Sequence, residues 1–113
     1  MVRLKRIYDR ADDEDGTRVL VDRLWPRGVR KEAAGVDWWA KEVAPSKELR
    51  TWLHQDPEGR FEAFAESYRR ELDGNPALER LGAMASEGTV TLLYASRERE
   101  RNHARVLAEL LGA

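Results

Sequence analysis

The chain contains no cysteine among its 113 residues, and this absence excludes several classes of protein. A disulfide-stapled scaffold, a thiolate nucleophile and a Cys-ligated zinc or iron–sulfur site all require cysteine. Histidine is nearly absent as well: His54 and His103 stand alone, outside any His-x-x-x-His or His/Asp cluster of the kind that holds a metal ion. We therefore expect no metal and no other cofactor.

Long hydrophobic runs are also lacking. No stretch approaches the roughly 18 apolar residues of a membrane-spanning helix, and residues 1–6 lack the apolar run of a signal peptide. Neither sign of charge is in excess, since 20 basic residues stand against 21 acidic ones. This balance argues against wholesale attraction to nucleic acid or to an anionic membrane. We expect a cytoplasmic protein that does not bind membranes.

The residues that are present suit one globular domain spanning 1–113. Hydrophobic residues make up 42% of the chain, and a chain of this length buries about two-thirds of its unfolded surface. Charge is unevenly placed along it. Residues 12–15 (Asp-Asp-Glu-Asp) are typical of a solvated loop, whereas the stretch from Arg18 to Lys31 carries five basic residues against Asp22 alone.

Three segments, residues 2–8, 18–25 and 89–95, have the pattern of β-strands. The last is apolar on both faces, which is typical of a central strand in a sheet that is covered on both sides. Residues 18–25 begin apolar and then turn abruptly polar.

Helix start signals separate the second and third strands, at Asp37, Ser46, Asp56-Pro57 and Asn75-Pro76. The first signal predicts a short helix that carries Trp38, Trp39 and Val43 and ends at Ala44-Pro45. An amphipathic helix that includes His103 and Leu107 follows the third strand. The order of elements predicts an α/β fold with a short, mainly parallel sheet flanked by helices. Residues 9–17 are too few for a crossover helix, so length alone favours a hairpin between the first two strands.

The most informative segment is residues 21–28, Val-Asp-Arg-Leu-Trp-Pro-Arg-Gly, where a buried strand ends. Ligands of open α/β sheets bind beyond the carboxyl ends of the strands. Arg23 and Arg27 offer planar donor forks for phosphate or carboxylate, and Trp25 offers a stacking face. Asp22 is a candidate base, or it orients a guanidinium. The alternative is a loop-fixing network in which Asp22 pairs with an arginine and Trp25 is simply buried.

A second polar segment, residues 96–103, follows the third strand. A last helix that begins near Arg97 or Glu98 makes Ser96 its N-cap, and the free N–H groups there attract anions. Arg97 would reinforce that site, with Asn102 and His103 farther along the helix. The alternative is that Ser96 only caps the helix and the Arg/Glu run is a solvated face. The glycines of a P-loop are missing, and no nucleophile elbow surrounds Ser96.

Four segments carry a resemblance to a known family: Asp-Arg-Leu-Trp-Pro-Arg-Gly at 22–28, Lys-Glu-Val-Ala-Pro-Ser at 41–46, Leu-Arg-Thr-Trp at 49–52, and residues 88–96 with Asn102. The chain closely resembles the YeaO-like branch of the domain-of-unknown-function family 488 over nearly its whole length. The resemblance implies a small bacterial or archaeal cytoplasmic protein of three-layer α/β type, with the first two strands joined by a helix and parallel. It implies no reaction.

The chain departs from the family pattern at two places. A histidine usually follows the Trp52 position by three residues, but here Gln55 stands there and His54 precedes it. Larger relatives carry Cys-His-Arg near the start of the last helix, where this chain has Arg101-Asn102-His103 or its neighbours. If that cysteine is a nucleophile, this chain cannot share its chemistry.

These patterns favour a pocket for a small anionic ligand, phosphate-containing or nucleotide-like, held by Arg23, Trp25, Arg27, Ser96, Arg97 and Asn102. Asp22 and His103 are the candidates for proton handling, and whether any catalysis occurs is open. One alternative is an interaction or regulatory module, monomeric or homodimeric, whose tryptophan-bearing helices meet a partner. A nucleic-acid-associated protein is the other alternative, and the net charge of −1 disfavours it.

Overall fold

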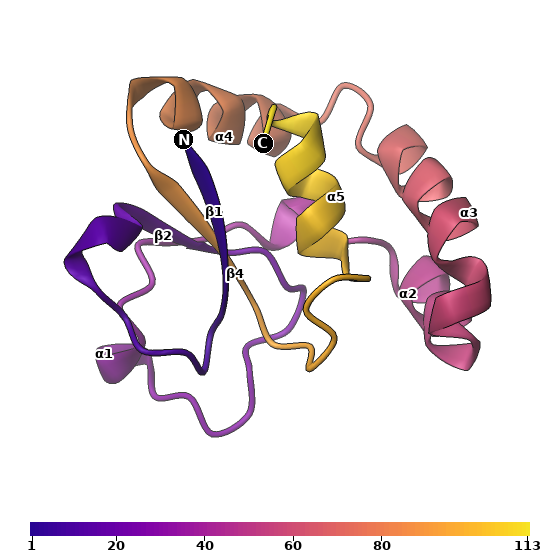
Figure 1. Ribbon diagram of the computed structural model, residues 1–113, viewed down its shortest axis with the longest axis horizontal. Helices are drawn as coiled ribbons and strands as arrows, with labels where there is room; N and C mark the ends of the chain where they lie inside the picture. Colours follow the sequence, from indigo (N-terminus) through magenta and orange to yellow (C-terminus); the bar gives the residue numbers. More distant parts are fainter.

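The computed structural model describes residues 1–113 and has an α/β architecture (Figure 1). The strands are β1 (Val2–Arg6), β2 (Thr17–Leu20), β3 (Trp38–Trp39) and β4 (Val90–Tyr94). The helices are α1 (Lys31–Ala34), α2 (Lys47–Gln55), α3 (Pro57–Glu71), α4 (Pro76–Glu87) and α5 (His103–Leu110), with 3₁₀ turns η1 (Asp13–Asp15) and η2 (Lys41–Val43). None of these helices combines the length and apolar character needed to cross a bilayer.

All four strands run parallel, in the order β1-β4-β2-β3. Val90 of β4 faces Val2 on one side and Thr17 on the other, so the apolar segment expected in the middle of the sheet is central. The hairpin expected from the length of the 9–17 connection is wrong. Residues 7–16 reach at most about 33–36 Å when extended, which is enough to return along a strand of about 17 Å. The connection therefore needs only η1, and β4 fills the space between β1 and β2.

The three helix starts after residue 45 are confirmed. The side chains of Ser46, Asp56 and Asn75 accept hydrogen bonds from the backbone N–H groups of Leu49, Gly59 and Ala77. These bonds satisfy donors that the first turn of a helix leaves unpaired.

The helix expected after Asp37 is wrong at its start, because Trp38 and Trp39 form β3, and only the 3₁₀ turn η2 around Val43 is helical. Trp38 lies opposite Val19 on the outer edge of β2. The Asp37 carboxylate accepts from the Arg18 N–H at 2.8 Å, and the Asp37 N–H donates to the Arg18 carbonyl. The side chain that looked like a helix cap thus extends the sheet edge, where aromatic residues pack well.

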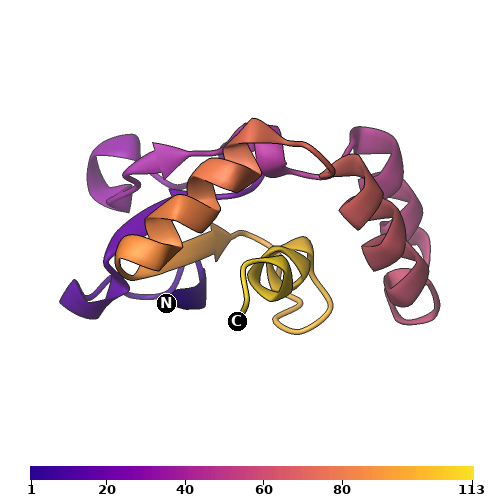
Figure 2. The ribbon, with the colours of Figure 1, turned by 90° about the horizontal axis from the view of Figure 1, so that it is seen from above.

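Both faces of the sheet are covered, so the molecule has three layers, but the two coverings differ in size. One face packs against the longer helices, with Val19 and Leu92 against Phe64, Tyr68 and the apolar side of α5. The other face is covered by the η1 turn, whose Asp15 carbonyl accepts from the Thr91 hydroxyl, and by the segment after β2 with the one-turn α1. Its apolar core members are Ile7, Leu20 and Leu93, with Trp25, Val29, Val36, Trp39 and Ala95 packed around them. Helices α2 and α3 lie side by side at one end of the molecule (Figures 1 and 2).

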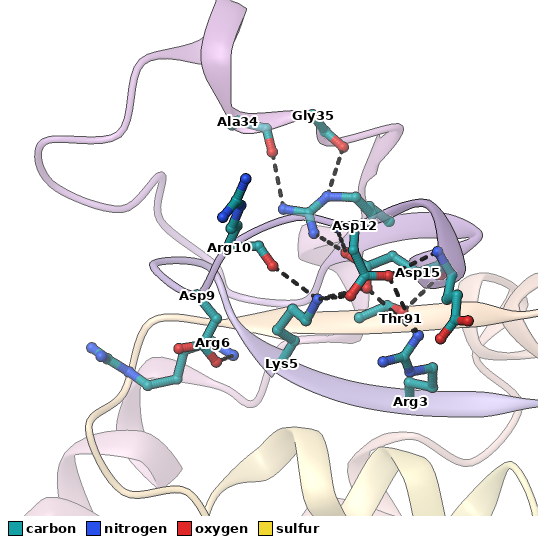
Figure 3. A network of polar contacts seen from close by, with 12 residues as sticks. Arg3, Lys5, Arg6, Asp9, Arg10, Asp12, Asp15, Ala34, Gly35 and Thr91 are labelled. Atoms are coloured by element: carbon teal, nitrogen blue, oxygen red, sulfur yellow. Dashed lines mark hydrogen bonds and ion pairs between the residues drawn. The ribbon is translucent and has the colours of Figure 1, made fainter.

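A buried ion cluster closes the turn between β1 and β2 (Figure 3). Asp15 is 0% exposed, so the solvated loop expected for residues 12–15 is wrong at this position. Lys5 Nζ donates to its carboxylate at 2.7 Å, and the Arg18 guanidinium donates to the other oxygen. Burial alone would raise the pKa of Asp15, but hydrogen bonds from Lys5, the Asp12 N–H and Arg18 outweigh burial and lower the pKa to about 2. Asp15 is therefore a charged part of the core.

Candidate functional site at the carboxyl ends of the strands

A cavity of about 550 Å³ opens beyond the carboxyl ends of β2 and β4. Seven of the eight residues expected at a site line it, namely Asp22, Arg23, Trp25, Arg27, Ser96, Asn102 and His103; Arg97 does not. The opposite wall comes from the α2–α3 pair, through Arg50, Leu53, His54, Pro57 and Phe64. No group of three or more His, Asp or Glu side chains is placed to hold a metal ion.

Asp22 and His103 join the ends of two strands to the start of α5. Asp22 Oδ2 accepts from the Ala95 N–H at 3.0 Å, directly after β4. His103 Nε2 lies 3.0 Å from Asp22 Oδ1 and 3.1 Å from the Val21 carbonyl oxygen. Both neighbours are acceptors, so Nε2 must carry the hydrogen. Asp22 Oδ1 is buried with no other donor, so Asp22 pairs with the histidine and not with an arginine.

Four arginines bring positive charge to the cavity. Arg23 Nη2 donates to the Pro45 carbonyl at 3.0 Å, which leaves most of its donors unused. Arg27 and Arg50 are exposed and form no ion pair, and Arg101 lies 3.6 Å from Glu98. The only carboxylates in the lining are Asp22 and Glu98, so guanidinium groups outnumber them by four to two. Guanidinium groups donate several hydrogen bonds in a planar fork, so this excess favours anions over cations at the cavity.

Trp25 is a fixed wall of the cavity. Its Nε1 donates to the Val29 carbonyl at 2.7 Å, and its ring meets Trp39 edge-on with 5.5 Å between centroids. Lys31 Nζ lies 5.5 Å from the ring centre. Trp25 therefore forms part of the cavity wall, and its ring packs mainly against Trp39 and Lys31.

The expected helix start near Arg97 is wrong, because α5 begins at His103. Asn102 is the N-cap, with its Oδ1 accepting from the Arg105 N–H at 2.9 Å, while the Ser96 hydroxyl accepts from the Glu98 N–H in a turn. Other hydrogen bonds hold residues 95–102 in a non-helical conformation. Arg6 donates to the carbonyls of Ala95 and Ser96, and Asn102 Nδ2 donates to the Glu98 carbonyl. The polar atoms of Asn102 are thus already bonded, and no helix N-terminus lies beside Ser96.

The residues expected at the site left out five polar lining residues: Tyr8, Arg50, His54, Glu98 and Arg101. Tyr8 follows β1, and only the parallel pairing of β1 brings it to this edge. Arg50, Leu53 and His54 have the i, i+3, i+4 spacing of one helix face, which was a signal for the second wall. Burial lowers the pKa of His54, and the positive charges of Arg50 and His103 lower it further.

A pH-dependent ion pair joins Asp9, which follows β1, to Arg99 in the segment between β4 and α5. Asp9 accepts two hydrogen bonds from Arg99 at 2.9 Å each, and these lower the pKa of Asp9 from 3.8 to about 2. Stability from a depressed carboxyl pKa is present above the unfolded value and is lost as pH falls through the folded value. We therefore expect the free energy of unfolding to drop between pH 4 and pH 2. In urea titrations at pH 5 and pH 2, Asp9→Asn should lose less stability than wild type; equal losses would contradict this.

A protein-family model describing the inactive DUF488-N3 subclade matches residues 1–113. The chain belongs to this family. Among DUF488 relatives, an uncharacterised protein of Mycobacterium tuberculosis is 50% identical over 110 residues, covering 97% of this chain and 92% of the relative. An uncharacterised Mycobacterium bovis protein has the same figures.

The uncharacterised protein YeaO of Escherichia coli is 42% identical over 111 residues, covering 97% of this chain and 96% of YeaO. The YeaO-like resemblance read from the motifs is therefore confirmed. No solved structure matches the chain significantly. The names of these DUF488 relatives assign no reaction, so the function must be argued from the site.

Proposed function

We propose that this protein binds a small phosphate-containing anion in the cavity beyond β2 and β4, and that it does so without chemical turnover. The observation that carries the proposal is the convergence of four guanidinium groups, from three separate segments, on one cavity with two carboxylates. Asp22 is already hydrogen-bonded to the Ala95 N–H and faces His103, so it repels an incoming anion less than an unpaired carboxylate would.

Arg23 and Arg27 are the phosphate ligands in this proposal. Both follow β2 closely, and their side chains are exposed at the cavity. Guanidinium groups bind phosphate through two parallel N–H···O bonds, which fixes the direction of the anion as well as its charge. Arg50 and Arg101 add positive charge from the facing wall and from the segment before α5.

Binding without turnover is supported by the absence of an activated nucleophile. The chain has no cysteine, and no hydrogen bond joins Ser96 to His103. His103 Nε2 is held between the Val21 carbonyl and the Asp22 carboxylate, so the Asp22–His103 pair bridges two strand ends and the start of α5. The matching family model is itself described as an inactive subclade.

Replacing Arg23 tests the proposal directly. In a thermal-shift series with inorganic phosphate and ribose 5-phosphate, wild type should be stabilised, by about 2.7 kcal/mol at a hundredfold excess over Kd. Arg23→Ala should abolish most of that shift, because one of two phosphate ligands is gone. Arg105→Ala, an exposed arginine of α5 outside the cavity lining, should keep it. No shift in wild type, or equal shifts in both variants, would rule the proposal out.

An interaction module is the second candidate, supported by Trp52. This residue is 37% exposed on α2, and the Arg60 guanidinium lies 4.8 Å from its ring centre. Trp38 is half-buried beneath Arg80, so it exposes less apolar surface to a partner protein. A nucleic-acid role has weaker support, because Arg18 of the basic stretch is buried against Asp15. Sedimentation of wild type and Trp52→Ala over a range of concentrations would reveal self-association at this surface.

A further inference from the structure

An aromatic side chain stands exposed at the cavity, and neither the family pattern nor the strand-end pattern accounts for it. Tyr8 follows β1, lines the cavity and is 49% exposed. Its hydroxyl donates to the Arg27 carbonyl oxygen at 3.0 Å, which fixes the ring beside the arginine that we assign to phosphate. An exposed, immobilised ring next to a phosphate ligand is a platform for a planar group.

The Arg6 guanidinium lies over the ring of Tyr8. The Arg6 guanidinium carbon lies 4.9 Å from the ring centre, and the same guanidinium donates to the carbonyls of Ser96 at 2.8 Å and Ala95 at 3.0 Å. Arg6 therefore covers one face of the ring and is itself held by the segment after β4. Arg6 and Tyr8 thus form a cation–π interaction, and 49% of the surface of Tyr8 remains exposed.

Trp25 is a poorer platform, although its residue type first suggested stacking. Its ring contacts Trp39 and Lys31, and its N–H is spent on Val29. Tyr8 differs because its hydroxyl bond to the Arg27 carbonyl orients the side chain, and because Tyr8 lines the cavity while 49% of the residue stays exposed. Trp25 therefore forms part of the cavity wall, whereas Tyr8 is the aromatic side chain available for stacking.

We infer that the cavity takes a nucleoside phosphate, with the base stacked on Tyr8 and the phosphate on Arg23 and Arg27. The inference rests on the proposed function, and it names the chemical class of the ligand. Every nucleobase has a π-face, so stacking on Tyr8 recognises a base without selecting one strongly. The cavity volume of about 550 Å³ lies within the usual range for small-molecule sites, roughly 300–1,000 Å³.

The test is isothermal titration calorimetry of the whole chain with inorganic phosphate, ribose 5-phosphate and adenosine 5′-monophosphate. Wild type should bind the nucleotide about tenfold more tightly than ribose 5-phosphate, because only the nucleotide carries a base that can stack. This comparison needs no variant, so it holds even if a substitution at Tyr8 disturbs folding. Equal affinities for the two phosphate esters would overturn the inference and leave the proposed function standing. Absence of binding by all three probes would overturn both.

Two substitutions then locate the stacking surface. Tyr8→Leu should lower nucleotide affinity about tenfold and leave ribose 5-phosphate affinity unchanged, because it removes the ring but keeps apolar bulk. Tyr8→Phe is the matched control: it deletes the bond to Arg27 but retains the π-face, so it should keep most of the nucleotide preference. A preference that survives Tyr8→Leu intact would overturn the assignment to Tyr8.

The same chemistry is offered by a free nucleotide and by the 5′-phosphorylated end of a single strand. A 5′-phosphorylated hexadeoxyadenylate, titrated at two salt concentrations, separates these sources. Affinity equal to that of the mononucleotide, with a similar salt dependence, supports the free nucleotide. Tighter binding with a steeper loss in salt supports the strand end, since each further phosphate contact releases counterions.

Discussion

Asp15→Asn is expected to lower the free energy of unfolding by about 3–5 kcal/mol, the usual cost of removing one member of a buried ion pair. The Asp15 carboxylate is 0% exposed and accepts from Lys5 and Arg18, while Arg3 lies 3.7 Å away. An asparagine removes the negative charge and points an N–H group at one of these cations. Arg18 is itself buried, so its charge would be left without compensation.

Asp13→Asn is the matched control for this prediction. Asp13 lies two residues away in the same acidic run, is exposed and forms no ion pair. Its substitution should change the free energy of unfolding by less than about 0.5 kcal/mol. Urea titrations of both variants at pH 7 measure the difference. A loss below about 1 kcal/mol in Asp15→Asn would mean that Lys5 and Arg18 find water or other acceptors at little cost.

Gly16→Ala is expected to cost about 3 kcal/mol or more, because backbone strain and a steric clash add together. Gly16 has φ +63° and ψ −133°, a combination that residues with a Cβ avoid. A Cβ built there would lie 2.3 Å from the Thr89 carbonyl oxygen, which also accepts the Thr17 N–H that begins the β2–β4 pairing. The clash is with backbone, so no side-chain rotation relieves it.

Gly74→Ala separates the clash from the strain. Gly74 has φ +71°, but nothing lies within 4 Å of the position that its Cβ would take. It should cost only the strain of a left-handed residue, about 1–2 kcal/mol. Thermal and urea unfolding of the two alanine variants provide the comparison. Equal losses would show that β4 shifts away from the turn without cost.

Local patterns predicted the elements well where the contacts that form them are local. Ser46, Asp56 and Asn75 satisfy N–H groups within their own helices, so the sequence alone identifies these caps. Asp37 and Ser96 are also residue types that favour helix N-caps, but contacts with residues distant in the sequence determine the backbone conformation at these two positions. Asp37 accepts from Arg18, and the segment after Ser96 is shaped by Arg6, which lies 90 residues away in the sequence.

The candidate site was predictable where it follows the strands. A polar interruption after each of two apolar strands pointed to one sheet edge, and Arg23, Arg27 and Ser96 do line one cavity. The wall formed by α2, and Tyr8 after β1, depend on how helices and edge strands pack, which strand patterns do not encode. The pairing of Asp22 with His103 joins residues far apart in sequence, so no local spacing indicated it.

The position of β4 has a consequence for how the chain acquires its fold during synthesis. Both β1 and β2 pair with β4, and Val2 finds its partner only at Val90. A ribosome therefore completes about four-fifths of the chain before the strand that joins the two emerges. Until then the edge of β2 that carries Val19 and Leu20 has no such partner and is open to association with other chains. Because pairings this distant in sequence also slow folding, we expect the sheet to form after synthesis of the chain rather than during it.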